Sequence, residues 1–207
     1  SVNEGYKEIL SQISSSSPTP GGGSVAALVL AHAHSLALMV ARLSKGRKIA
    51  AAGVEAADAV ILSSESGADR AIVLAEKDAE AFDAVMRAFR LPKGDEAEVS
   101  ARKGEIRNAT WGAAAVPLET AFEACELLVS IQKLAEHGNL NALTDLAASA
   151  ELANTAAHIA AMNVRINLYS IEGEDVENEA ARIERLLATS NELVGMIRSI
   201  VSERLGW

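Results

Sequence analysis

A long run of small apolar residues, introduced by a turn of proline and glycine, constrains this chain more than any other feature. Pro20 and three glycines precede Ser24 and the run 25–41, and Gly46 closes the stretch. Proline and glycine punctuate helix ends in this way, so we expect a helix over residues 22–44, about 34 Å long. Such small side chains favour a core of closely packed helices.

The rest of the chain also predicts an all-α fold. Aromatic residues make up only 3% of the chain, and no alternating strand pattern joined by a turn is found. Pro92 ends one helical tract, and Pro117 lies inside another, where a kink or a break is expected. We predict one domain over residues 1–207, a bundle of about six to eight long helices. The further helical tracts are 2–13, 47–91 (one long helix or two abutting ones), 97–136, 139–170 and 176–204.

Charge and cysteine content exclude several classes of protein. The net charge is −9, which argues against nucleic-acid binding. The single cysteine, Cys125, rules out an internal disulfide and a thiolate metal cage. The run 25–41 is the one candidate membrane span, but its histidines and many alanines favour a buried core helix. No secretory signal is visible, so we expect a cytoplasmic protein that does not act at a membrane.

The chain lacks the patterns that mark common metal and nucleophile sites. His32 and His34 are two residues apart, so a helix points them about 200° from each other and they cannot share a metal ion. No His-Glu-x-x-His or Cys-x-x-Cys pattern exists, and no motif pairs a serine or cysteine with a base. We therefore expect neither a metal ion nor a cofactor.

Asp78 is the best candidate for acid–base chemistry. On a helix it shares a face with Phe82 and Phe89. A carboxylate on an apolar, partly buried face has a raised proton affinity and can act as an acid or a base. The alternative is an ordinary solvated carboxylate, since Glu80 and Asp83 lie nearby.

The glycine-rich turn is a candidate binding element. Gly21, Gly22, Gly23 and Ser24 leave backbone N–H groups uncovered at a helix N-terminus. Such groups suit an anion or a carbonyl oxygen, and the missing side chains permit a close approach. The alternative is a flexible turn before a buried helix.

Three polar residues of the tract 139–170 form a second candidate. At 100° per residue, Asn141, Asp145 and Asn163 fall on one helix face, and the residues between them are apolar. Buried polar groups need partners, which the protein or a ligand can supply. Helix capping and interhelix hydrogen bonds are the alternative, because Asn141 lies near a helix start.

Four motifs follow one another between residues 16 and 168. They read SPTPGGGSVAAL with MVARL, DAEAFDAV with RLPK, GNLNALTDL, and NVRINL. Their order resembles the cyclodeaminase/cyclohydrolase family of folate enzymes. That family includes the cyclodeaminase part of formiminotransferase-cyclodeaminase and a stand-alone methenyltetrahydrofolate cyclohydrolase.

The resemblance implies an all-helical homodimer acting on the one-carbon bridge between N5 and N10 of tetrahydrofolate. It does not choose between ammonia release from formiminotetrahydrofolate and water addition to methenyltetrahydrofolate. It maps the family's proposed acid–base aspartate onto Asp78. Asn141, Asp145 and Asn163 would hold the pterin or orient the carboxylate, and the backbone of residues 21–24 would border the cleft.

A basic cluster follows the second predicted helix, comprising Arg42, Lys45, Arg47 and Lys48. The family often reads Leu-Gly-Lys-Lys-Tyr here, and this chain keeps the basic character but not the aromatic residue. Arg42, Lys45 and Lys48 would meet the tail carboxylates of a mono- or polyglutamylated folate. Two alternatives stay open: a non-catalytic helical dimer that binds folate or a protein partner, and an enzyme for another formimino or cyclic amidine compound.

Overall fold

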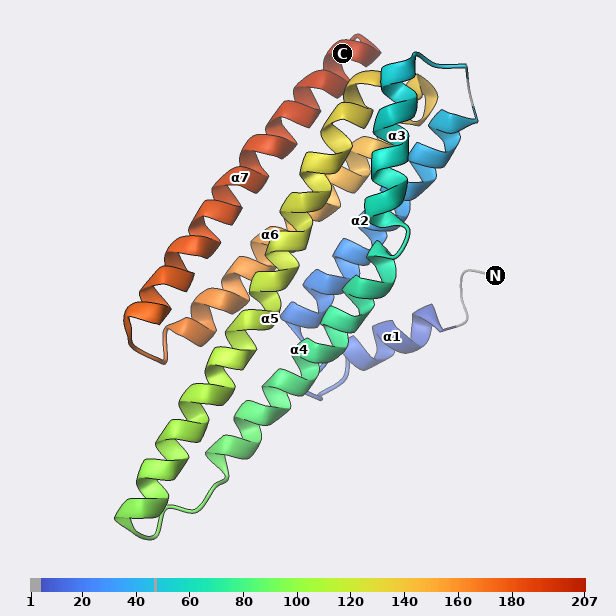
Figure 1. Ribbon diagram of the computed structural model, residues 1–207. Helices are drawn as coiled ribbons and strands as arrows, with labels where there is room; N and C mark the ends of the chain where they lie inside the picture. The colour runs from blue at the N-terminus through green and yellow to red at the C-terminus, as the bar shows by residue number, and fades with distance from the viewer. Residues whose placement is uncertain (1–4, 47) are drawn as a thin grey trace.

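The computed structural model describes residues 5–46 and 48–207, and its regular elements there are all helices. The predicted all-α class is confirmed, and Figure 1 shows the long helices side by side in an elongated bundle. The helices are α1 (Tyr6–Ile13), α2 (Gly22–Lys45), α3 (Ala51–Ser64), α4 (Gly67–Phe89), α5 (Glu96–His137), α6 (Leu143–Leu168) and α7 (Glu174–Leu205), with a short 3₁₀ turn, Leu140–Ala142, before α6. The expected start of the first helix at Val2 lies outside the described residues.

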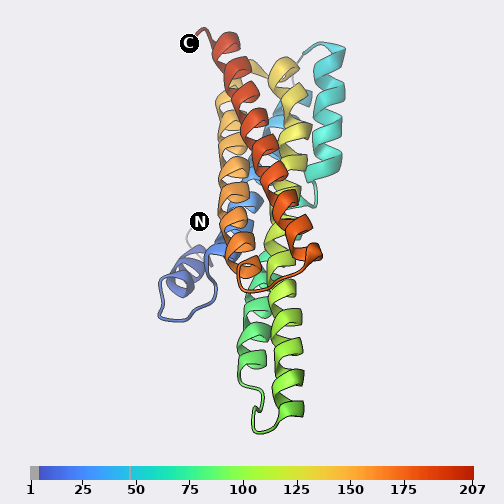
Figure 2. The same ribbon diagram turned by 90° about the vertical axis from the view of Figure 1, so that its left-hand side faces the viewer.

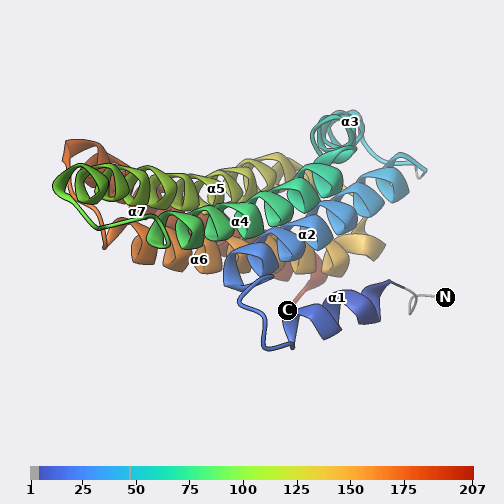
Figure 3. The ribbon, with the colours of Figure 1, turned by 90° about the horizontal axis from the view of Figure 1, so that it is seen from below.

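The packing places α2 beside both α6 and α4. α5 packs along α6, α7 covers these two, and α3 lies against one end of α2 and α5. In Figure 2, the C-terminal part of α4 and the N-terminal part of α5 project below the other helices. Figure 3 shows α2 and α6 on one side of the bundle, with α1 standing apart beyond them. Alanine is the commonest buried residue, as the sequence predicted for closely packed helices.

The tract 47–91 forms two helices, α3 and α4, rather than one. α4 begins at Gly67, and a Cβ there would collide with the ring of His34 on α2. A glycine at this position therefore allows the start of α4 to lie directly on α2.

Of the kink or break expected at Pro117, the break does not occur, because α5 runs through this residue. Proline has no N–H to donate to the carbonyl of Ala113, four residues earlier. Asn167 of α6 instead donates its amide Nδ2 to the Ala113 carbonyl at 2.9 Å. The carbonyl that proline leaves free is thus satisfied, and α5 continues as one helix of 42 residues.

α2 is the one helix of the described chain with the length and composition of a membrane span. In its most apolar window, 56% of the residues are buried inside the bundle. Core helices of soluble proteins meet the same criteria.

Candidate active site

The Asp78 carboxyl group lies against the first turn of α2. Its Oδ2 accepts a hydrogen bond from Ser24 Oγ at 3.0 Å, and the buried Ser24 hydroxyl is also 3.1 Å from the carbonyl oxygen of Ala75. A Cβ on Gly23 would collide with the carboxyl group. The missing side chain at Gly23 is therefore what lets Asp78 reach this helix N-terminus.

Opposing influences act on the protonation of Asp78. Burial is the largest, and it raises the pKa of this half-buried carboxyl group. The hydroxyl and the backbone N–H of Ser24 both bond to the carboxylate and offset part of this rise in pKa. The positive end of the α2 dipole also favours an anion here. Ser24 and the helix dipole thus stabilise the ionised form of Asp78, while desolvation favours its protonated form.

The Ser24 hydroxyl can serve both protonation states of Asp78. It has one proton and two acceptors within hydrogen-bond distance. When Asp78 is ionised, the hydroxyl donates to the carboxylate. When Asp78 is protonated, the acid donates to Ser24 Oγ and the hydroxyl turns to the carbonyl of Ala75. Both states are hydrogen-bonded, which suits a group that gains and loses a proton.

α6 brings the Asn163 side chain to the same helix start, and Asn167 joins α6 to α5 nearby in sequence. The Asn163 amide lies against Gly22, where an added Cβ would be 3.5 Å from its Nδ2, and this Nδ2 donates to the carbonyl of Ile159 at 2.9 Å. Asn167, one turn further along, donates Nδ2 to the carbonyls of Asn163 and Ala113, each at 2.9 Å. Parts of three motifs therefore meet here: the glycine-rich turn, the aspartate segment and the closing asparagine segment.

Our sequence analysis did not single out Asn167 as a site residue. The signal that could have found it is Pro117, because a proline inside an unbroken helix frees the carbonyl four residues earlier. A buried carbonyl needs a donor, and Asn167 is that donor. The contact holds α6 against α5 with Asn163 turned toward α2.

Asn141 and Asp145 lie at the opposite end of α2. The neighbouring Asn139 donates its backbone N–H to Ser44 Oγ at 2.9 Å, which joins this segment to the last turn of α2. Ser24 and Ser44 are separated by about 30 Å of helix at the usual rise. Within one chain the structure therefore does not bring Asn141 and Asp145 to Asp78.

The basic cluster lies at this far end as well. Lys45 Nζ is 2.6 Å from Asp58, and Arg42 is 3.8 Å from Glu65. Lys48 is exposed, and Arg47 lies outside the described residues. Within one chain these cations do not reach Asp78.

A separate cavity of about 200 Å³ lies between α5, α6 and α7. Trp111, Phe122, Val164 and Arg182 are among the residues that line it. It contains none of the site residues predicted from the sequence. The cavity therefore does not enlarge the site around Asp78.

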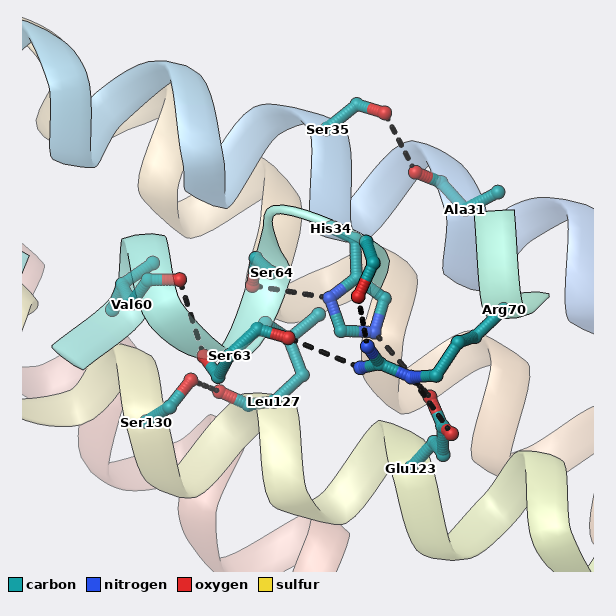
Figure 4. A network of polar contacts seen from close by, with 11 residues as sticks. Ala31, His34, Ser35, Val60, Ser63, Ser64, Arg70, Glu123, Leu127 and Ser130 are labelled. Atoms are coloured by element: carbon teal, nitrogen blue, oxygen red, sulfur yellow. Dashed lines mark hydrogen bonds and ion pairs between the residues drawn. The ribbon is translucent and has the colours of Figure 1, made fainter. Parts of the chain in front are cut away.

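His34 belongs to a second buried polar cluster, shown in Figure 4. Its ring is 3% exposed, with Nδ1 3.1 Å from Ser64 Oγ and Nε2 3.9 Å from Glu123. Glu123 in turn pairs with Arg70 at 3.2 Å. Burial, reinforced by the positive charge of Arg70, lowers the pKa of His34 to about 4. Neutral His34 thus joins side chains of α2, α3, α4 and α5.

Among the described residues, no group of three or more His, Cys, Asp and Glu side chains is placed to hold a metal ion. The site is built instead from one carboxyl group, side-chain amides and the backbone of a helix start.

The family model for formiminotransferase-cyclodeaminase matches residues 5–184. The chain belongs to this family, which confirms the resemblance found in its motifs.

Two relatives and one solved structure are similar to this chain over most of its length. The chain is 34% identical over 205 residues to methenyltetrahydrofolate cyclohydrolase of Methylorubrum extorquens, covering 98% of both chains. It is 33% identical over 181 residues to formimidoyltransferase-cyclodeaminase of Rattus norvegicus, covering 87% of this chain and 33% of that protein. A crystal structure of formiminotetrahydrofolate cyclodeaminase from Thermotoga maritima matches with a TM-score of 0.87 at 29% identity, covering 100% of this chain and 99% of that one.

Proposed function

We propose that this enzyme of folate one-carbon chemistry uses Asp78 to move protons at the N5–N10 bridge of tetrahydrofolate. The relatives that match over their full length support the substrate. One observation carries the role of Asp78: its half-buried carboxyl group bonds to Ser24 where Gly23 leaves the helix start open. Asn163 is our proposed group for binding the pterin or orienting the reacting groups, and its position beside Gly22 supports this role.

The cyclohydrolase reaction needs several proton transfers near one carbon. Water forms a bond to the cationic methenyl carbon and gives one proton to the Asp78 carboxylate. The bond from this carbon to N5 then breaks and N5 takes that proton from the carboxylic acid, while the remaining hydroxyl proton is released to solvent and the C=O of the formyl group forms on N10. A carboxyl group whose two protonation states are both hydrogen-bonded suits this cycle.

The cyclodeaminase reaction uses the same groups. The formimino group on N5 first takes a proton from solvent, and N10 then attacks its carbon and loses the N10 proton to the carboxylate. The formimino nitrogen takes a proton from the acid and leaves as ammonia, which closes the methenyl bridge. In either reaction the cations Arg42, Lys45 and Lys48 are our proposed contacts for a mono- or polyglutamate tail.

The test is a spectrophotometric assay of the purified protein with both folate substrates, because methenyltetrahydrofolate absorbs distinctively. We expect turnover of at least one substrate above the uncatalysed rate. Tight binding of methenyltetrahydrofolate with no turnover of either substrate would contradict the proposal. That result would support the non-catalytic alternative.

A further inference from the structure

We propose that the cavity between α5, α6 and α7 is a binding site for a small organic ammonium compound whose body is apolar and about the size of one aromatic ring. The cavity contains neither Asp78 nor any other residue of the site described above. The inference therefore does not depend on the folate chemistry proposed for Asp78.

Three helices form the walls of this cavity. α5 contacts both α6 and α7, and Figure 1 shows the three helices side by side. The space between them has a volume of about 200 Å³. Since an engineered cavity of about 150 Å³ in another protein binds benzene, this space has room for one aromatic ring with a short chain.

The floor of the cavity is apolar. It is formed by buried side chains of α5 and α6, which belong to one hydrophobic cluster: Ala114, Leu118, Val164 and Leu168. Trp111 packs against the same cluster and also lines the cavity. An apolar ligand body gains free energy by leaving water for such surroundings.

Glu179 of α7 places a carboxylate oxygen at this apolar space. Its Oε2 is buried, and within the described chain it has no hydrogen-bond partner. Arg182 Nη1, one turn along the same helix, is 3.5 Å from Oε2 but makes no hydrogen bond to it. A buried carboxylate oxygen without a donor is unfavourable, and an ammonium group of a ligand would supply that donor.

The charges around the cavity favour a cation over an anion. Two carboxylates and one guanidinium line it, those of Glu119, Glu179 and Arg182, so the lining carries one net negative charge. The aromatic rings of Trp111 and Phe122 also line the cavity, and aromatic faces attract cations. A ligand with a single positive charge neutralises the lining. Phenethylamine, a primary ammonium on one ring, is a suitable probe.

Tryptophan fluorescence can report binding at this cavity. The chain has two tryptophans, and Trp207 lies 79% exposed at the C-terminal end, so Trp207→Phe leaves Trp111 as the reporter. Phenethylamine should change this fluorescence saturably, and calorimetry on the parent should give one site per chain. No saturable change up to about 10 mM, a weak limit for a ligand of this size, would overturn the proposal.

Two further ligands of matched size test the role of charge. 2-Phenylethanol keeps the ring and the chain but is neutral, and phenylacetate carries a negative charge. The alcohol should bind at least about tenfold more weakly than phenethylamine, because a hydrogen bond between two ionised groups is stronger. Phenylacetate should bind more weakly still. Equal binding of amine and alcohol, or tighter binding of phenylacetate through Arg182, would overturn the proposal.

Variants of the cavity wall test the assigned residue. Glu179→Gln should weaken phenethylamine binding at least about tenfold. Glu177→Gln is the control, since it makes the same change of charge at an exposed position of α7 and should change the affinity little. Ala115→Phe fills the cavity from an exposed wall position and should abolish binding with Glu179 intact. Equal affinities of the parent and Glu179→Gln would overturn the assignment.

Asp78→Asn separates this site from the proposed active site. It should bind phenethylamine as tightly as the parent, because Asp78 does not line the cavity. Binding that is lost in Asp78→Asn but kept in Glu179→Gln would place the amine at Asp78 and overturn the inference. If the parent turns over neither folate substrate, the proposed function fails, and these binding measurements still decide whether the cavity takes an ammonium ligand.

Discussion

Asp78 and His34 are both buried titratable groups packed against α2, but they lie in different surroundings. Burial disfavours the charged form of each, which raises the pKa of Asp78 and lowers that of His34 to about 4. His34 is enclosed by side chains of three other helices. Asp78 is half-buried at a helix start to which α6 also brings the Asn163 amide. A shifted pKa is therefore common to both groups. The greater accessibility of Asp78 and the polar groups around it distinguish the candidate site from the His34 cluster.

The largest expected effect is that of Asp78→Asn. The amide keeps the size of the side chain but cannot exchange a proton, and general acid–base catalysis contributes about 10²–10⁴-fold. The kcat should fall by about that factor, while folate binding stays within a few-fold of the parent. Asp83→Asn, on the exposed side of the same helix, is the control and should change little. Near-parental kcat of Asp78→Asn on both folates would contradict the proposed mechanism.

Two glycine substitutions should have different effects in the regions around Asp78 and His34. Gly23→Ala pushes the Asp78 carboxyl group aside, and a misplacement of about 1 Å can cost about 10²-fold in rate. Gly67→Ala presses on the buried His34 ring instead, so it should cost about 1–3 kcal/mol of stability with little change in kcat.

Steady-state kinetics and urea unfolding measure the two effects. Gly195→Ala on α7 is the control, since a Cβ there would meet nothing within 4 Å. Equal losses of activity in Gly23→Ala and Gly67→Ala would mean that the two regions do not differ as described.

The next smaller effect is expected from removing the hydroxyl of Ser24 or of Ser64, which form a matched pair. Each hydroxyl bonds to the titratable group of its region, Ser24 to Asp78 and Ser64 to His34. Ser24→Ala removes a hydrogen bond to a carboxylate, which contributes about 1.5–3 kcal/mol, so it should lower kcat at least tenfold and raise the pKa of Asp78 further. Ser64→Ala should leave kcat near the parental value. The opposite ranking in a kinetic comparison would argue for His34 as the functional group.

The smallest effect is a pH dependence of stability that originates at His34. Its pKa is lowered in the folded protein, so the unfolded chain binds more protons between the ordinary pKa of 6.5 and about 4. The free energy of unfolding should therefore fall as pH drops through this window, by up to about 1.4 kcal/mol per pH unit.

Urea unfolding at pH 7 and pH 5 measures this slope in the parent and in His34→Gln. The slope should be smaller in the variant. For Asp78 the sign is reversed, because a raised carboxyl pKa destabilises the ionised protein above that pKa. Asp78→Asn should therefore be somewhat more stable than the parent near neutral pH. An unchanged slope in His34→Gln would show that other groups produce it.

Local patterns were enough to predict much of this molecule. Apolar spacing and the punctuation by glycine and proline gave the all-α class and the extent of α2, because these signals act within a few residues. The contact of Asp78 with the start of α2 joins two of the motifs found in the sequence. The structure places them in contact, and their catalytic role stays a prediction.

Local sequence patterns could not predict contacts between residues that are far apart in the chain. Helical periodicity puts Asn141, Asp145 and Asn163 at one angle around an axis but does not give their separation along it, which is about 27 Å between Asp145 and Asn163. The continuity of α5 through Pro117 depends on a donor 50 residues later in the chain, Asn167. Such a partner is visible only after the helices have packed.

The measurement that tests the central claim most directly is the pH dependence of kcat/KM for methenyltetrahydrofolate, after subtraction of the uncatalysed rate. It compares the parent with Asp78→Asn. We predict a limb in the parent profile that reports a carboxyl group titrating above the ordinary aspartate range, because burial raises the pKa of Asp78. This limb should be absent from the residual activity of Asp78→Asn. The same limb at the same pH in the variant would contradict the assignment of proton transfer to Asp78.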